Sequence, residues 1–195
     1  MAVSSVNKHV ERKLSHHRSI DIVGYQRSDG LYDIEAKLID VKGIDITTPD
    51  RPDIPVGESL HDMTLCLTLD TTMKIIDVNT SMDATPYNTC PEVADAYKAL
   101  IGERIGGGWT KTIKILFGGI KGCTHLRELL GPIATVAFQT VVDEECRTKD
   151  YQESMGVFKA MVNGCYGLKG DGVNVARLWP ELAEPFTEIS PEITE

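Results

Sequence analysis

Residues 20–41, IDIVGYQRSDGLYDIEAKLIDV, contain two largely apolar stretches on either side of the short polar segment SDG. Gly30 in that segment can adopt the positive φ that a tight hairpin turn demands. The two stretches are therefore predicted to be β-strands that pair with each other. A sheet that starts in this way needs cover on one of its faces.

Two further strands are expected after a polar, proline-containing connection over residues 43–59. In MTLCLTL, residues 63–69, apolar side chains occupy every second position, while Cys66 lies between threonines on the opposite face. KIIDVNTSM, residues 74–82, follows the turn DTTM as the next strand. Residues 19–84 thus predict an antiparallel meander.

The second half of the chain is expected to supply helices. Pro91 suits a first helical turn, and apolar residues follow it at helical spacing until Gly102. Residues 109–117 predict a short helix, and a further helix is expected around residues 154–162.

A long helix is expected over residues 125–147, with Thr124 as its N-cap and Pro132 as a kink or interruption. Its apolar stripe consists of Leu126, Leu129, Leu130, Ile133, Ala137 and Val141. Strands first and helices afterwards indicate an α+β fold. We expect an antiparallel N-terminal sheet covered on one face by C-terminal helices.

The composition is that of a soluble globular protein, with 42% hydrophobic and 25% charged residues. The net charge of −9 argues against nucleic-acid and anionic membrane partners. Residues 1–19 lack the apolar core of a secretory signal, so a cytoplasmic location is predicted. We expect a flexible lead-in over residues 1–18, one domain over 19–180 and an acidic tail over 181–195. The sequence leaves open whether the protein forms a homo-oligomer.

Two of the five cysteines, Cys90 and Cys123, each precede a predicted helix. Unpaired backbone N–H groups at a helix start stabilise thiolates, both as nucleophiles and as metal ligands. If the two helices pack in parallel, Cys90, Cys123 and His125 would converge beside the glycine-rich GGIKG segment. Sulfur and imidazole ligands favour Zn or Fe over Mg or Ca.

Simpler interpretations of these residues stay open. A cysteine at a helix start is often just a small, partly buried side chain. His125 could sit in the first helical turn and bond a carboxylate. The spacing from Cys90 to Cys123 matches no compact zinc motif.

Three other residues are candidates for proton transfer. His61 neighbours Asp62, which could ligate a metal or orient the imidazole of His125. Tyr87 precedes Cys90 by three residues and could act as a general acid, or simply pack on the sheet edge. GERIGGGW lacks the Gly-Lys-Ser/Thr ending of a P-loop, so no nucleotide cofactor is expected.

Several segments resemble a family of uncharacterised bacterial proteins, a domain of unknown function, over about residues 16–180. They are GYQRSDGLYDIEAKLIDVK, LHDMTLCLTLD, DATPYNTCPEVADAYKALIGERIGGGW, GGIKGCTHLRELLGPIATVAFQT and NGCYGLKGDG. The family's motif positions fall on His61, Asp62, Met63, Pro86, Tyr87, Cys90, Pro91, Cys123, Thr124 and His125. Tyr166 stands where the family often has a histidine, which weakens Cys165 as a further ligand.

The resemblance implies a cytoplasmic protein of bacteria that degrade aromatic compounds. We expect an enzyme that acts on a small aromatic substrate by lyase or hydrolytic chemistry with Zn or Fe. The alternative is a metal or iron-sulfur carrier, since the order of sheet and helices is similar to that of iron-sulfur scaffold proteins. A cofactor-free version would use His61 with Asp62 as the base and Cys123 as the nucleophile.

Overall fold

The computed structural model describes residues 10–185 of the chain. These residues form two compact units, divided after Val141. The predicted lead-in and tail lie partly outside the described residues, namely at residues 1–9 and 186–195.

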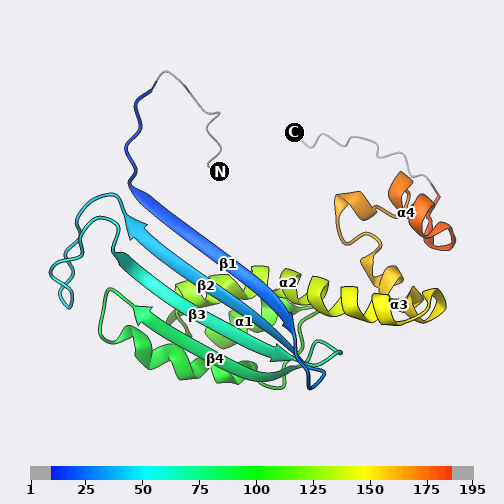
Figure 1. Ribbon diagram of the computed structural model, residues 1–195, viewed down its shortest axis with the longest axis horizontal. Helices are drawn as coiled ribbons and strands as arrows, with labels where there is room; N and C mark the ends of the chain where they lie inside the picture. The colour runs from blue at the N-terminus through cyan, green and yellow to red at the C-terminus, as the bar shows by residue number, and fades with distance from the viewer. Residues whose placement is uncertain (1–9, 186–195) are drawn as a thin grey trace. The chain divides into compact units, whose positions relative to one another are not determined.

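The first unit is built on the predicted four-stranded antiparallel sheet, whose strands lie side by side in chain order (Figure 1). They are β1 (His16–Gln26), β2 (Tyr32–Lys42), β3 (Ser59–Leu69) and β4 (Ile75–Ala84). Gly30 has a φ of 83°, as the predicted turn between β1 and β2 requires. Strand β1 begins at His16, so the predicted lead-in is part of the sheet from that residue onward.

One face of the sheet carries the core. The expected alternation in β3 is confirmed, because every second residue from Met63 to Leu69 is buried. In β2 the buried apolar residues are Tyr32, Ile34, Ala36 and Leu38. The register places Leu38 opposite Met63 and Ala36 opposite Leu65, so the two stripes form one continuous apolar surface.

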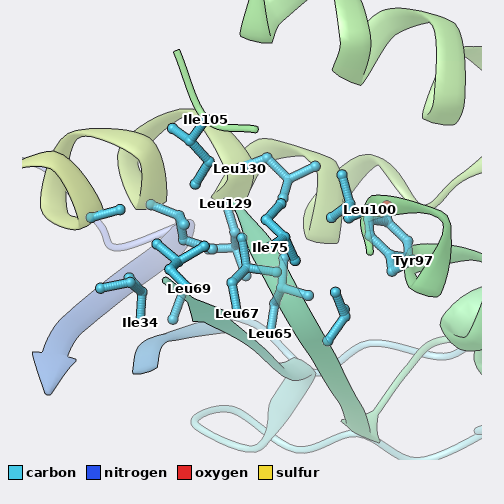
Figure 2. Packing of buried hydrophobic residues seen from close by; sticks show 14 of the residues in the cluster. Ile34, Leu65, Leu67, Leu69, Ile75, Tyr97, Leu100, Ile105, Leu129 and Leu130 are labelled. Atoms are coloured by element: carbon cyan, nitrogen blue, oxygen red, sulfur yellow. The ribbon is translucent and has the colours of Figure 1, made fainter. Parts of the chain in front are cut away.

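Helical segments cover that surface, which confirms the α+β fold (Figure 1). They are η1, a 3₁₀ helix (Cys90–Leu100), α1 (Trp109–Phe117), the short η2 (Gly119–Lys121) and α2 (Thr124–Thr148). Figure 2 shows side chains from the helical segments and the strands in one cluster, with Leu129 and Leu130 above Leu65 and Leu67.

Segment η1 has the helical spacing expected after Pro91 but forms a 3₁₀ helix rather than an α-helix. Its two buried residues, Tyr97 and Leu100, are three positions apart. A 3₁₀ helix has three residues per turn, so both side chains point to the core from one line along the segment. Ile101, expected on the same face, is exposed.

Helix α2 matches the prediction closely. All six residues of its predicted stripe are buried. Pro132 lies inside the helix, which continues through it without interruption to Thr148. Within residues 10–185, no helix combines the length and apolar character needed to cross a bilayer.

The second unit, from residue 142 onward, has its own small core. It contains α3 (Tyr151–Met161), η3 (Tyr166–Leu168), α4 (Val173–Leu178) and η4 (Pro180–Leu182), so the helix expected around residues 154–162 is present. The rings of Phe158 and Trp179 stack with their centroids 5.0 Å apart.

Gly24 in β1 lies directly beneath Thr140 of α2. A Cβ atom at Gly24 would be 2.0 Å from the Thr140 Oγ1 and 2.9 Å from its Cβ. We expect Gly24→Ala to lower the free energy of unfolding by about 1–3 kcal/mol. Thr140→Ala removes the Oγ1 atom that would be closest to the new Cβ. In that background Gly24→Ala should therefore lower the free energy of unfolding by less. Urea denaturation of all four proteins measures this coupling, and equal costs in the two backgrounds would contradict the packing described here.

Candidate functional site

The apolar stripe of β2 ends in a buried carboxylate. Asp40 continues the alternation of β2, so it faces the helices and is only 1% exposed. In β3 the equivalent position is His61, which is 8% exposed and directly opposite Asp40 in the register. Burying a carboxylate costs free energy unless it is paired and hydrogen-bonded, so Asp40 requires polar partners.

Strand β1 supplies two of these partners, because its register places Arg18 opposite Asp40. Arg18 donates from Nε to Oδ1 of Asp40 at 2.8 Å and from Nη2 to Oδ2 at 2.7 Å. His16 Nε2 lies 3.2 Å from Oδ1. His61 Nδ1 completes the set at 2.9 Å from Oδ2. Each of the two carboxylate oxygens of Asp40 therefore has two close nitrogen partners.

Helix α2 brings His125 to the same carboxylate from its first turn. Its Nε2 lies 3.7 Å from Asp40 Oδ2, and its ring centroid is 3.8 Å from that of His61. The chain just before this turn is fixed by Tyr97, whose buried hydroxyl donates to the Cys123 carbonyl at 2.8 Å.

Asp40, His61 and His125 form a group that could hold a metal ion. Each offers a ligand atom, and these atoms all lie within 4.8 Å of one another. Two imidazoles and one carboxylate are a donor set used by Zn and Fe in proteins.

Burial determines the charge states in this group. It lowers the pKa of His61 to about 4, and the nearby His125 adds to the effect. Burial also lowers the pKa of His125. Burial alone would raise the pKa of Asp40, but the hydrogen bonds and charge of Arg18 outweigh it, so this pKa is lowered. At neutral pH the group thus contains one carboxylate and two neutral imidazoles, the protonation states that metal binding needs.

Of the two predicted thiolate ligands, Cys123 lies beside this group. Cys123 Sγ is 3.8 Å from His125 Nδ1. Burial raises the pKa of Cys90, and the proximity of Cys123 adds to the rise. Among the described residues, no group of three that includes a cysteine has its ligand atoms within 4.8 Å. The structure therefore places His125 with Asp40 and His61, and metal ligation by Cys90 and Cys123 stays a prediction.

The other predicted site residues lie in different surroundings. Asp62 is on the opposite face of the sheet from His61, where Lys37 Nζ lies 3.0 Å from its carboxylate. Asp40, not Asp62, is the carboxylate that contacts His61.

Tyr87 follows β4 in a turn and is 49% exposed, so its proton-transfer role also stays a prediction. Cys165 is exposed and belongs to the second unit.

An open cavity of about 430 Å³ lies at the same end of the sheet as His61. Three of its lining residues, Ser59, Asp83 and Ala84, belong to the strands. In the register Ser59 lies opposite Val41 and Ala84 lies opposite Asp62. Arg51 is held at its wall by the Ser59 carbonyl and the Glu58 carboxylate. The other lining residues are Thr85 and Asn88. Most of these residues are polar, so the cavity suits a polar ligand.

The buried His61 makes stability dependent on pH. Its pKa falls from 6.5 to about 4 on folding, so the unfolded chain binds the proton more tightly. The stabilisation is therefore complete above pH 6.5 and is lost as the pH falls towards 4, by an amount on the order of 3 kcal/mol. Urea denaturation across this range should show a smaller pH dependence in His61→Gln; an unchanged dependence would contradict the assignment.

Two neighbouring carboxylates on opposite faces of the sheet allow a matched comparison. Asp40→Asn leaves Arg18 with the partly exposed Glu128 as its remaining counter-charge, so we expect a loss of about 2–4 kcal/mol in unfolding free energy. Asp62→Asn removes only the surface ion pair with Lys37 and should cost at most about 1 kcal/mol. Chemical denaturation measures both, and similar costs would argue against a special role of Asp40.

The family comparison covers this whole arrangement. A family model described as "Protein of unknown function (DUF2889)" matches residues 16–139, which include the sheet, the first helical segments and Asp40, His61 and His125. The match is shorter than the span expected from the sequence resemblance. No curated protein and no solved structure matches the chain. More than half of the sequence fits the family model, and the chain therefore belongs to the DUF2889 family, whose function is unknown.

Proposed function

We propose that the protein is a metal-dependent enzyme that acts on a small organic substrate by hydrolytic or lyase chemistry. The observation that carries this proposal is the buried group of Asp40, His61 and His125, with its ligand atoms within 4.8 Å of one another. Catalytic zinc sites use three protein ligands and leave a further position for water or substrate. A metal in such a site polarises a carbonyl group or activates a water molecule.

The donor set favours Zn or Fe(II) as the metal. Zn is bound by imidazole and carboxylate ligands in many hydrolases, and two histidines with one carboxylate are also the ligands of many non-haem iron enzymes. The strands and α2 hold all three donors in a rigid frame, as a preorganised site requires.

His16 is the residue best suited to move a proton beside this group. Its Nε2 lies 3.2 Å from Asp40 Oδ1, and its side chain is 37% exposed, whereas Asp40 is buried. Its ring therefore reaches both the solvent and the carboxylate. We propose His16 for the role that the sequence suggested for Tyr87 or His61.

A cavity at the same end of the sheet as His61 offers room for a small substrate. Its volume of about 430 Å³ is within the range of small-molecule sites. Its polar lining favours a substrate with hydrogen-bonding groups. The aromatic character of the substrate rests on the sequence resemblance alone.

One observation favours a second candidate, a hydrolase without a metal. Cys123 Sγ is 3.8 Å from His125 Nδ1, and His125 Nε2 is 3.7 Å from Asp40 Oδ2. Thiol, imidazole and carboxylate thus follow one another in the order of a nucleophile, a base and the group that orients it. Catalytic hydrogen bonds are often longer than normal before substrate binds.

Metal analysis of purified protein separates these candidates. We expect near-stoichiometric Zn or Fe in the wild type and at least a tenfold loss in Asp40→Asn, His61→Ala and His125→Ala. His17→Ala is the matched control, because His17 is an exposed histidine of β1 that lies outside the group.

The cysteine variants complete the comparison. Loss of metal in Cys90→Ala and Cys123→Ala, with full occupancy in Asp40→Asn, would overturn the proposed ligands in favour of a thiolate site. Folded, monodisperse wild-type protein that binds neither metal would leave the Cys123, His125 and Asp40 series as the candidate to test with thiol-reactive probes.

A further inference from the structure

The side chain with the shortest hydrogen bonds to Asp40 is a cation, Arg18. Arg18 bonds both oxygens of Asp40 through Nε and Nη2, at 2.8 and 2.7 Å. Its remaining nitrogen, Nη1, donates to Glu128 Oε2 on α2. The guanidinium thus bridges a buried carboxylate and one that is 45% exposed.

This arrangement conflicts with simple metal binding at Asp40. A divalent ion bound to Asp40 needs one of the two oxygens that Arg18 already occupies. Ion and guanidinium would then be two cations on one carboxylate, and their repulsion is strong in a poorly solvated setting. A metal ion on Asp40 and the bound Arg18 guanidinium therefore disfavour each other.

Glu128 offers the displaced guanidinium a second partner. It lies three residues after His125 on α2, so both side chains are on the same side of that helix. Its carboxylate already accepts a hydrogen bond from Arg18, and a small movement of the arginine side chain would transfer more of the guanidinium to it.

We propose that Arg18 competes with the metal ion for Asp40 and that Glu128 accepts the guanidinium when the ion binds. The Arg18–Glu128 pair then sets the affinity of the site for the metal ion. When no ion is bound, Arg18 balances the negative charge of Asp40. This inference rests on the proposed function, because it assumes that Asp40 is a metal ligand.

Zinc affinity, measured at fixed pH by competition with a chromophoric chelator, tests the inference. Arg18→Gln removes the competing cation and should tighten zinc binding at least tenfold. Glu128→Gln removes the second partner and should weaken it at least threefold. In the double variant the Glu128→Gln effect should disappear, because Glu128 acts only through Arg18. Arg27→Gln is the matched control, since Arg27 pairs with Asp29 and Asp33 at the other end of β1 and should leave affinity unchanged.

The outcomes distinguish this inference from the proposed function. If zinc binding depends on Asp40 but Arg18→Gln leaves it unchanged or weaker, Arg18 is not a competitor and only this inference fails. A Glu128→Gln effect that persists in the double variant would make Glu128 a ligand and would also overturn it. Zinc binding that survives Asp40→Asn, or binding in neither the wild type nor Arg18→Gln, would remove the metal site itself. Should Arg18→Gln not fold, Glu128→Gln changes an exposed carboxylate and still decides whether affinity falls.

Discussion

The buried carboxylate of Asp40 constrains which side chains β1, β3 and α2 can place around it. It lies at the last inward-facing position of a strand whose other inward positions are apolar. An ionised group there is stable only if several donors converge on it. Strand β1 contributes His16 and Arg18, β3 contributes His61, and α2 contributes His125. The requirement to compensate one charge thus links three strands and a helix at one point.

The fold could be predicted well because each element carries its own periodic signal. The alternation from Met63 to Leu69 shows which face of β3 is buried, and the six-residue stripe of α2 shows which side of the helix meets it. Whether η1 forms an α-helix or a 3₁₀ helix was harder to predict. Residues three apart, such as Tyr97 and Leu100, fit the period of an α-helix almost as well as that of a 3₁₀ helix.

The site was less predictable because it depends on strand register. His61 and His125 could be selected as titratable residues at the starts of elements. Asp40 was missed, although it is in phase with the buried residues of β2, and that phase is the signal that could have revealed it. Asp62 is the carboxylate next to His61 in sequence, yet neighbouring residues of a strand point to opposite faces. Arg18 was assigned to a flexible lead-in, because nothing local shows that β1 begins at His16.

The proposed enzyme rests on the group of Asp40, His61 and His125, which could hold a metal ion. The identity of the ligands is the claim on which this interpretation depends. X-ray absorption spectroscopy on the zinc-loaded protein tests it most directly. Coordination by Asp40, His61 and His125 predicts only nitrogen and oxygen neighbours at about 2.0–2.2 Å, with the outer-shell scattering of imidazole. A sulfur neighbour at about 2.3 Å would contradict it and place the metal on the thiolates of Cys90 and Cys123 instead.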